Sequence, residues 1–375
     1  MRCHRSSSRW NDVFRPASRA AKIRAGERTI RRHCILVLAL AIAACSSGEQ
    51  AGAPSPSDED ALATTAADPT PAEPAVPFVA VTAGQWHSCG LRTDSTVACW
   101  GDNRHGRADA PSGSFSAVDA GGTHSCGLRT DNTIACWGDG DDRKTDAPAG
   151  RFREITTGGT HSCGLRTDDT IDCWGDNSDG KTDAPGGGFQ AVSAGHSHSC
   201  GLRIDGTIDC WGRGILGDAD PPAGLFRTIS TGEYQMCGLH NDGIVECRGV
   251  DFVPLGEAPD ERFEGISVGS EHACGVRTDK TIACWGPFVL LPNGVQWHEG
   301  DTATVSPDPP DATGATFRAV SVGYQHSCGI LTDGGIECWG DNYFGEAHPP
   351  AGTFLDIAGG VDHWCGVRSD KTIVC

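Results

Sequence analysis

The stretch Cys163-Gly-Leu-Arg-Thr-Asp-Asp-Thr-Ile-Asp-Cys173-Trp-Gly175 is the unit from which most of the sequence is built. Variants of it occur eight times, each with two cysteines ten residues apart. Successive first cysteines are 37 residues apart, except that 17 further residues separate Cys274 from Cys328. A repeat of this length is typical of a solenoid or a propeller, whose modules become stable only by stacking on their neighbours.

The unit itself predicts a β-hairpin closed by a disulfide. Leu165 and Ile171 alternate with polar or small residues, and the segment 167–169 has the composition of a turn. A three-residue hairpin loop needs a left-handed third residue, and that position is Gly, Asn or Asp in five repeats. In this register the two cysteines face each other, with Cβ atoms about 4.5–5.5 Å apart, near the roughly 3.5–4.5 Å of a disulfide. We therefore expect eight disulfides: Cys89–Cys99, Cys126–Cys136, Cys163–Cys173, Cys200–Cys210, Cys237–Cys247, Cys274–Cys284, Cys328–Cys338 and Cys365–Cys375.

The rest of each period predicts one more strand and a loop. A Phe stands eleven residues before every first cysteine, followed by Val or Ile three residues later and then by Gly, as in Phe152, Ile155 and Gly158. This pattern indicates a buried strand that ends at a tight turn. Each period is thus all-β with three short strands, and a weak fourth strand is left open.

Residues 1–44 have the pattern of a signal peptide. The segment is rich in Arg, and the apolar run 34–44 is too short to span a bilayer. The ending Ile42-Ala43-Ala44-Cys45 resembles a bacterial lipobox, which predicts lipidation of Cys45. The alternative is an ordinary signal peptide cut nearby, with Cys45 incidental. Ser46 resembles the residue that sorts lipoproteins to the outer membrane of Gram-negative bacteria. The long basic segment leaves the true translation start open.

The cysteine count agrees with export. The sequence has 19 cysteines. Without Cys3, Cys34 and Cys45, sixteen remain, all in the repeats. Export would also supply the oxidising compartment that disulfides need.

Residues 45–77 follow as a tether rich in Ala, Pro, Ser and Thr, with the composition of a disordered segment. Pro74 precedes Phe78 by the same interval as prolines in later repeats, and the eighth repeat ends at Cys375 without a Trp-Gly loop. These two features suggest that residues 68–77 complete the last blade. The folded domain is then expected to span 78–375, with an insertion in 287–316.

The repeat pattern Gly-x-x-His-Ser-Cys-Gly-Leu-x-x-Asp-Gly-x-Ile-x-Cys-Trp-Gly-x-Asn resembles the regulator of chromosome condensation repeat, in a cysteine-rich bacterial form. The resemblance covers residues 78–375 and implies a β-propeller. Members of the family commonly have seven blades, whereas this sequence contains eight hairpins; eight is favoured and seven is left open. The eukaryotic founder promotes nucleotide exchange on a small GTPase and binds chromatin. A secreted bacterial relative with short blades inhibits β-lactamase. The resemblance therefore implies a scaffold and leaves the function open.

Charge argues against nucleic acid as a partner. The chain has a formal net charge of −19, and residues 46–375 carry 20 Lys and Arg against 47 Asp and Glu. Phosphate backbones are bound by clusters of Lys and Arg. An acidic surface suits a basic partner instead.

Recurrent residues offer no metal or cofactor site. A His stands two residues before the first cysteine in seven repeats, but equivalent positions on separate blades cannot converge on one ion, so packed, hydrogen-bonded histidines are expected. Zinc motifs use shorter cysteine spacings. The acidic runs 139–142 and 176–180 lack the closing Glu of a calcium loop, and turns explain them more simply. The Trp after the second cysteine, present in six repeats, is expected to pack between blades.

Function is expected where the repetition breaks, in repeats four to six. Their loops carry apolar and aromatic residues where the other repeats carry Asp and Asn, and exposed apolar groups often mark a binding patch. The alternative is sequence drift, with the insertion capping a worn blade. The candidate binding residues are Ile215, Leu216, Tyr234, Phe252, Leu255, Phe288, Leu290, Trp297, His298 and Glu299.

These observations predict an exported, lipid-anchored β-propeller that binds another protein at the bacterial cell envelope. A carbohydrate-binding propeller is the alternative, although repeated sugar sites would repeat their aromatic residues. A propeller enzyme, a lyase or hydrolase acting through His298, Glu299 and Asp301, is the third possibility. We expect no enzyme, because no set of catalytic residues stands outside the repeat pattern.

Overall fold

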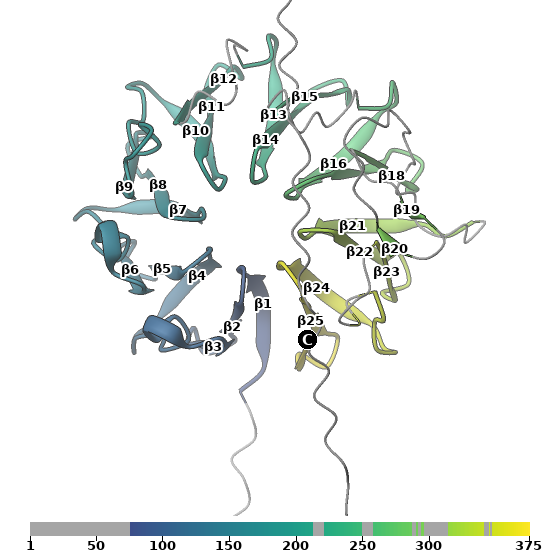
Figure 1. Ribbon diagram of the computed structural model, residues 1–375, viewed down its shortest axis with the longest axis horizontal. Helices are drawn as coiled ribbons and strands as arrows, with labels where there is room; N and C mark the ends of the chain where they lie inside the picture. The colour runs from purple at the N-terminus through teal and green to yellow at the C-terminus, as the bar shows by residue number, and fades with distance from the viewer. Residues whose placement is uncertain are drawn as a thin grey trace, which may run out of the picture. The chain divides into compact units, whose positions relative to one another are not determined.

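Residues 76–375 form a ring of eight three-stranded antiparallel sheets, the blades (Figure 1). The computed structural model describes residues 76–212, 221–249, 258–286, 290–291, 294–295, 314–340, 345 and 347–375. By its contacts the chain divides into residues 1–68 and 69–375, and all the described residues lie in the second unit. The count of eight blades confirms the favoured prediction, and within the described segments each blade has three strands.

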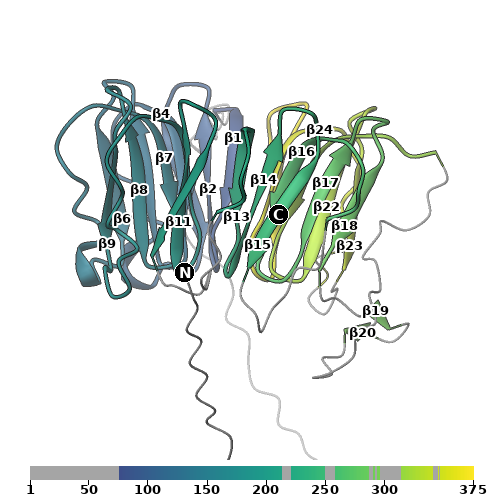
Figure 2. The ribbon, with the colours of Figure 1, turned by 90° about the horizontal axis from the view of Figure 1, so that it is seen from above.

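Every blade runs outward from the axis, from an inner strand through a middle strand to an outer strand (Figures 1 and 2). The inner strands are β1 (Phe78–Ala83), β4 (Phe115–Ala120), β7 (Phe152–Thr157), β10 (Phe189–Ala194), β13 (Phe226–Thr231), β16 (Phe263–Val268), β21 (Phe317–Val322) and β24 (Phe354–Gly359). The middle strands are β2 (His87–Arg92), β5 (His124–Arg129), β8 (His161–Arg166), β11 (His198–Arg203), β14 (Gln235–His240), β17 (Ala273–Arg277), β22 (His326–Leu331) and β25 (Trp364–Arg368).

The outer strands are β3 (Val97–Gly101), β6 (Ile134–Gly138), β9 (Ile171–Gly175), β12 (Ile208–Gly212), β15 (Val245–Gly249), β18 (Ile282–Trp285), β23 (Ile336–Gly340) and β26 (Ile373–Val374). Two short 3₁₀ turns, η1 (Arg104–Gly106) and η2 (Asp141–Arg143), follow β3 and β6, and a small hairpin, β19 (Leu290–Leu291) with β20 (Gly294–Val295), follows β18. No helix among the described residues is both long and apolar enough to cross a membrane.

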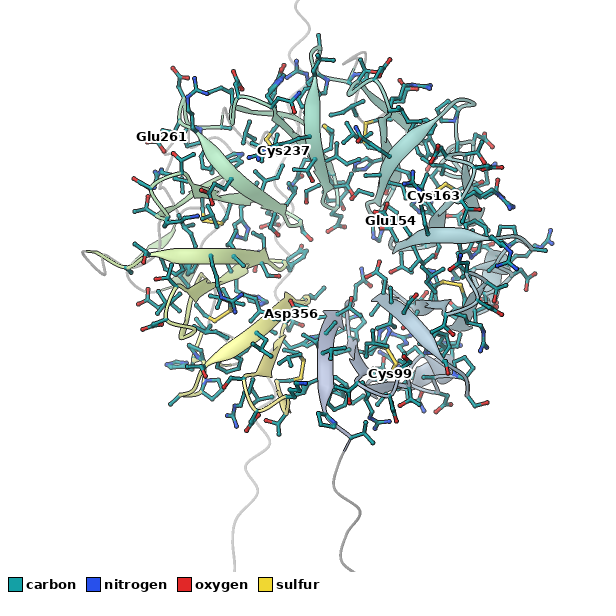
Figure 3. All side chains as sticks on the ribbon, turned by 180° about the vertical axis from the view of Figure 1, so that it is seen from behind. Cys99, Glu154, Cys163, Cys237, Glu261 and Asp356 are labelled. Atoms are coloured by element: carbon teal, nitrogen blue, oxygen red, sulfur yellow. A yellow bond between two sulfur atoms is a disulfide. The ribbon has the colours of Figure 1, made fainter. Side chains whose placement is uncertain are left out.

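The hairpin between the middle and outer strands has the predicted register. In the third blade Cys163 pairs with Cys173 and Leu165 with Ile171. All eight predicted disulfides are present, with Cα–Cα distances of 4.0–4.1 Å, and they are spread around the ring (Figure 3). The third loop residue has positive φ in all eight hairpins, including Ser95, Lys280 and Lys371, where the sequence fits this conformation less well.

The hydrophobic core lies between neighbouring blades rather than inside any one of them. One cluster joins Cys163, Leu165 and Ile171 of the third blade to Phe189 and Val192 of the fourth. The same arrangement recurs around the ring and confirms the expected stacking. Six of the eight outer strands carry a Trp, and in the second, third and fourth blades it lies edge-on to the Phe of its own blade.

The ring closes by the same contacts that join blades elsewhere. The backbone N–H of Phe78 donates to the carbonyl oxygen of Lys371 at 2.8 Å, as the next inner strand does to Ser95. Asp356 Oδ2 also accepts a hydrogen bond from the N–H of Val81 at 3.1 Å across the junction of the eighth and first blades, as Glu154 does from Val192 between the third and fourth blades. The eighth sheet consists of β24, β25 and β26 within the described residues. The prediction that residues 68–77 complete it falls largely outside the described residues and stays a prediction.

The Arg that ends most middle strands and the Asp of the following hairpin turn have separate roles. In the third blade the turn residue Asp168 accepts hydrogen bonds from the backbone and side chain of Thr170. Arg166 stacks over the ring of Phe152 at 4.7 Å and pairs with Asp172. The turn aspartate therefore holds the loop, and the arginine covers the edge of the core.

Candidate binding site on the propeller axis

Eight turns between the inner and middle strands surround the axis at one end of the ring. We call them the axial turns: residues 84–86, 121–123, 158–160, 195–197, 232–234, 269–271, 323–325 and 360–362. The first residue of each is Gly. A Cβ built on Gly121 would overlap the carbonyl oxygen of Gly158 in the next blade, and the same holds at every step, including Gly360 against Gly84. These glycines are required because the backbones of neighbouring blades approach too closely for a side chain.

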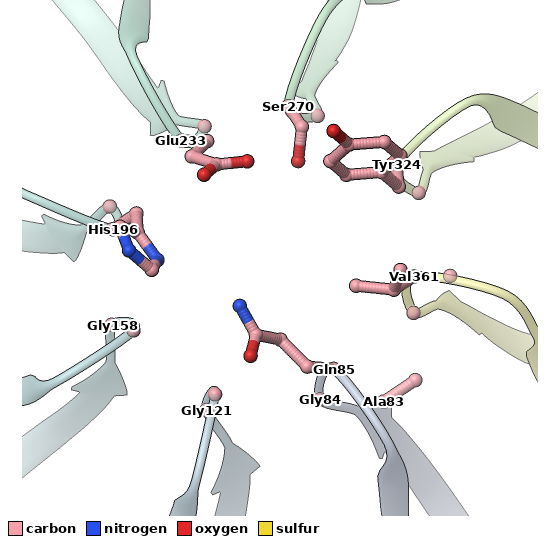
Figure 4. A pocket seen from close by; sticks show the side chains of 18 of the residues that line it. Ala83, Gly84, Gln85, Gly121, Gly158, His196, Glu233, Ser270, Tyr324 and Val361 are labelled. Carbon is pink, nitrogen blue, oxygen red and sulfur yellow. The ribbon is translucent and has the colours of Figure 1, made fainter. Parts of the chain in front are cut away.

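The residue after each of these glycines points towards the axis, and it differs from blade to blade. In order around the ring these residues are Gln85, Gly122, Gly159, His196, Glu233, Ser270, Tyr324 and Val361. Figure 4 shows the side chains of Gln85, His196, Glu233, Ser270, Tyr324 and Val361 converging on a common space. The repeat thus holds the backbone constant and varies the one side chain that faces the axis.

These residues line a cavity of about 500 Å³. Its wall is uneven: blades 2 and 3 contribute only small residues, whereas blades 4 to 7 contribute His196, Glu233, Ser270 and Tyr324. Trp86, which is 46% exposed, stands at the edge of the same space. A cavity of this size with several convergent polar groups has the character of a ligand-binding site. We call it the axial pocket.

Carboxylates give one side of the axial pocket a negative potential. Burial and the charge of Glu233 raise the pKa of Glu271, while hydrogen bonds from Gln325 and Tyr324 oppose the shift. Gln325 Nε2 donates to Glu271 Oε2 at 3.1 Å. The pKa of Tyr324 is raised as well, by burial and then by the charges of Glu271, Glu233 and Asp362. Tyr324 therefore lies in the field of three carboxylates from three different blades.

A buried lattice of histidine and serine supports the axial turns from behind. His87 Nε2 and Ser125 Oγ of the next blade are 2.6 Å apart, and the pairs His124–Ser162 and His161–Ser199 have the same geometry at 2.7 Å. Burial lowers the pKa of His124 and His161 to about 3, so these rings are neutral. The recurrent histidines are therefore packed and hydrogen-bonded, as the sequence indicated. Within the described residues no group of three or more potential ligands could hold a metal ion.

The loops that follow the outer strands begin beside the axial turns. The N–H of Asp139 donates to the carbonyl of Thr123 at 3.1 Å, and that of Asp176 to the carbonyl of Thr160 at 3.0 Å. A side chain on Gly212 or Gly286 would contact the axial turn of its own blade in the same way. The loops predicted to bind a partner therefore leave the ring at the end that carries the axial pocket.

Most of the predicted binding residues lie outside the described residues. This applies to Ile215, Leu216, Phe252, Leu255, Phe288, Trp297, His298 and Glu299, and the backbone alone of Leu290 is described, in β19. Tyr234 is the exception: it lies in the fifth axial turn next to Glu233 and is partly buried. Cys45 also lies outside the described residues. These assignments stay predictions.

The acidic runs that weakly resembled calcium loops have another role. Asp176 Oδ2 accepts a hydrogen bond from the buried Lys181 at 2.7 Å, and Asp139 pairs with the buried Lys144 in the same way. Hydrogen bonds from Lys181 and Ser178 hold the pKa of Asp176 well below its usual range, against the effect of burial. In each run one carboxylate is thus already paired with a buried lysine.

Sequence reasoning missed the axial residues because it sought function only in the loops. The signal was present: the residue after the recurrent Gly, at 85, 122, 159, 196, 233, 270, 324 and 361, is far more variable than that Gly and as variable as the residue that follows it. Sequence reasoning also missed a second recurrent residue, the Ser that directly follows most of the recurrent histidines. Its repeat spacing of 37 residues is that expected of a side chain that contacts the neighbouring blade.

Comparisons with known proteins support the fold and the repeat. Five segments match the Regulator of chromosome condensation (RCC1) repeat: residues 78–107, 115–143, 152–181, 189–217 and 317–346. Comparison with curated proteins found no match.

Among solved structures, the CRINKLY WD40 ectodomain of the Arabidopsis thaliana receptor kinase ACR4 is 25% identical, with a TM-score of 0.53, over 71% of this chain and 96% of that one. The ectodomain of the Physcomitrella patens receptor kinase CR4 is 30% identical, with a TM-score of 0.49, over 58% of this chain and 64% of that one, just under two thirds of its length. Yeast RCC1 (Prp20), solved bound to Kap60, is 16% identical, with a TM-score of 0.45, over 56% of this chain and 70% of that one. The chain thus carries at least five RCC1 repeats, and its described residues form a β-propeller, as the repeated hairpin signature indicated.

Proposed function

We propose that this propeller is an exported, lipid-anchored module of the bacterial cell envelope that binds another protein through the end of the ring carrying the axial pocket. The single observation behind the proposal is the variation at the axial positions. Eight otherwise equivalent turns present Gln85, two glycines, His196, Glu233, Ser270, Tyr324 and Val361. Side chains that only pack a repeated fold tend to repeat with it, whereas a binding surface differs from point to point.

Three further features support this proposal. The RCC1 repeat builds a protein-interaction fold, and propellers with this repeat are generally binding or exchange-factor domains rather than enzymes. The loops of blades 4 to 6, where the sequence is most apolar, leave the ring beside the axial turns. The signal-peptide pattern and Cys45 favour export and anchoring, and the low number of basic residues disfavours nucleic acid.

Carbohydrate binding is the competing function. The exposed Trp86 is the kind of ring on which a sugar stacks. However, the axial aromatic residues occur in single copies on different blades, which suits one composite site better than a set of equivalent sugar sites.

The test is affinity capture from envelope extracts of a host strain with the full oxidised chain. A double variant, Glu233→Ala with Tyr324→Ala, should lose the captured protein. The control variant Glu261→Ala changes an exposed carboxylate that pairs with Arg277 away from the axial turns, and it should retain the partner. Capture that is equal for both variants would contradict binding through the axial pocket. Anchoring is tested separately, because labelled fatty acid should be incorporated by the wild-type chain and not by Cys45→Ser.

A further inference from the structure

We propose that the axial pocket binds the side chain of a lysine or arginine from the partner protein. The inference rests on the proposed function and adds the chemistry of the group that enters the pocket. It is argued from the size of the pocket, its charge and the kinds of side chain that line it.

The axial pocket has the dimensions of a site for one side chain with water. Its volume of about 500 Å³ lies within the range of roughly 300–1,000 Å³ that is usual for small-ligand sites. Blades 2 and 3 line it with glycines and with only two small side chains, those of Ala120 and Thr157. The functional side chains come from the remaining blades and leave the centre free (Figure 4).

The charge of the pocket selects a cation. Glu233 lines it directly, Glu271 lies behind Tyr324, and these two carboxylates with Asp362 raise the pKa of the tyrosine. Its lining contains no lysine or arginine among the described residues, and the one imidazole there belongs to His196. An anion would be repelled by the negative charge of Glu233 and Glu271, whereas a cation would be attracted to it.

A buried amide fixes the backbone of the same wall. Gln235 is fully buried, and its amide nitrogen donates to the carbonyl oxygens of Gly269 at 3.1 Å and Ser270 at 2.8 Å, both from residues that line the pocket. Gln235 does not itself line the pocket, so its role is to hold the two turns from which the wall is built.

A neighbouring part of the wall suits the apolar stem of such a side chain. Trp86 is 46% exposed and lines the pocket together with Val361 and the ring of Tyr324. These three residues come from the seventh, eighth and first blades, next to the acidic group. Lysine and arginine combine an aliphatic stem with a charged end, and aromatic faces attract cations. The pocket offers both kinds of surface side by side.

The test uses the pentapeptides Ac-Gly-Gly-X-Gly-Gly-NH₂, with X as Lys, Arg, norleucine or Nε-acetyllysine. Binding to the full oxidised chain is followed by NMR through the indole N–H signal of Trp86, assigned with Trp86→Phe. The Lys or Arg peptide should shift this signal at concentrations at least about tenfold below the norleucine and acetyllysine peptides, because only the charged forms meet the carboxylates.

The matched variants are Glu233→Gln with Glu271→Gln, and Glu264→Gln as the control. Glu264 is exposed, pairs with Lys280 and lies in β16 outside the pocket. The double variant should weaken binding of the charged peptide at least about tenfold and leave the norleucine peptide unaffected, whereas Glu264→Gln should change neither. Unchanged thermal stability of the double variant shows that the loss is not one of folding.

The outcomes separate this inference from the proposed function. Equal binding of charged and neutral peptides, or equal effects of the two sets of variants, would overturn the cation assignment. A monosaccharide that shifts the Trp86 signal more strongly than the Lys and Arg peptides would overturn it in favour of carbohydrate. If the partner protein is lost with Tyr324→Ala but kept by Glu233→Gln with Glu271→Gln, protein binding stands and the cation assignment fails.

Discussion

The junctions between neighbouring blades are of two kinds, and the difference shows which contacts the ring requires. At the regular junctions, between blades 1 and 2, 2 and 3, 3 and 4, 6 and 7, and 8 and 1, a His bonds to the Ser of the next blade at 2.6–2.8 Å. At the irregular junctions 4–5 and 7–8, Met236 and Trp364 replace that Ser, and His198 Nε2 has no hydrogen-bond partner within the described residues. At the irregular junction 5–6, Gln235 replaces the His and bonds to backbone carbonyls. The junctions on both sides of Glu233, a residue of the axial pocket, are thus irregular.

This difference indicates what the ring tolerates. Both kinds of junction keep the strands, the disulfides and the axial glycines, while the polar bonds between the blades change. The repeated core and the backbone contacts therefore hold the ring, and the His–Ser bonds are replaceable.

The largest expected effect is loss of stability in acid. Burial lowers the pKa of His87 and His198 to about 4 and of His124, His161 and His272 to about 3. Between pH 6.5 and these values the unfolded chain binds protons that the folded chain does not, so stability is complete above pH 6.5 and is lost as pH falls. At about 1.4 kcal/mol per pH unit for each histidine, the free energy of unfolding should fall by at least about 3 kcal/mol from pH 6.5 to 4.

Urea unfolding of the oxidised chain at pH 7, 5.5 and 4.5 measures this fall. The double variant His124→Gln with His161→Gln gives two regular junctions the Gln that Gln235 supplies at an irregular one. It should weaken the pH dependence of the unfolding free energy. Buried Asp119, Glu154 and Asp356 act in the opposite direction, because their pKa values are raised. A pH slope that is the same with and without the two histidines would contradict the assignment.

The axial glycines should matter equally at both kinds of junction. Gly121→Ala at a regular junction and Gly232→Ala at an irregular one each place a Cβ on the carbonyl oxygen of the next blade. Backbone cannot move aside as a side chain can, so each variant should lose about 2–3 kcal/mol of unfolding free energy. The control is Gly265→Ala, where nothing lies within 4 Å of the added Cβ, and it should stay within about 1 kcal/mol of wild type. A large loss of unfolding free energy at only one junction would show that close backbone contact does not stabilise both kinds of junction.

The sequence was sufficient to predict the structural features that recur in every repeat. The ten-residue spacing of Cys163 and Cys173 predicted both the hairpin register and its disulfide, because a side-chain period of two leaves one register in which both cysteines face each other. Eight hairpins gave the blade number. The approach of Gly121 to Gly158 was not readable, since it depends on how neighbouring turns meet around an axis that no single repeat defines.

The axial pocket was missed for the same reason. Residues 85 and 324 are far apart in sequence, and each looks like one variable position in a turn. Only closure of the ring brings them to one cavity. Long-range convergence of this kind follows from tertiary structure, so sequence reasoning turned to the loops, where the composition changes more visibly.

Smaller effects are expected at the His–Ser bonds. A double-mutant cycle on His124→Ala and Ser162→Ala should give a coupling energy of about 1 kcal/mol, as for other buried hydrogen bonds. The same cycle on His198→Ala and Met236→Ala should give less than about 0.5 kcal/mol, since no such bond exists there. Denaturant unfolding of the four chains in each cycle provides both numbers. Equal coupling at the two junctions would remove the distinction between them.

The smallest effect concerns the hairpin turns, at the end of the ring opposite the axial turns, where the kind of junction should be irrelevant. The third loop residue has φ of 69° at Ser95 and 93° at Gly243. A non-glycine residue in this region is strained by about 1–2 kcal/mol, which outweighs the roughly 0.5–1 kcal/mol entropic cost of glycine. Ser95→Gly should therefore raise the unfolding free energy by about 0.5 kcal/mol, and Gly243→Ser should lower it by a similar or larger amount. Thermal unfolding of the oxidised chains measures both changes. Ser95 lies in the first blade and Gly243 in the fifth. Opposite changes of comparable size in the unfolding free energy would show that blades at both kinds of junction share the same hairpin turn. A change confined to one blade would contradict this.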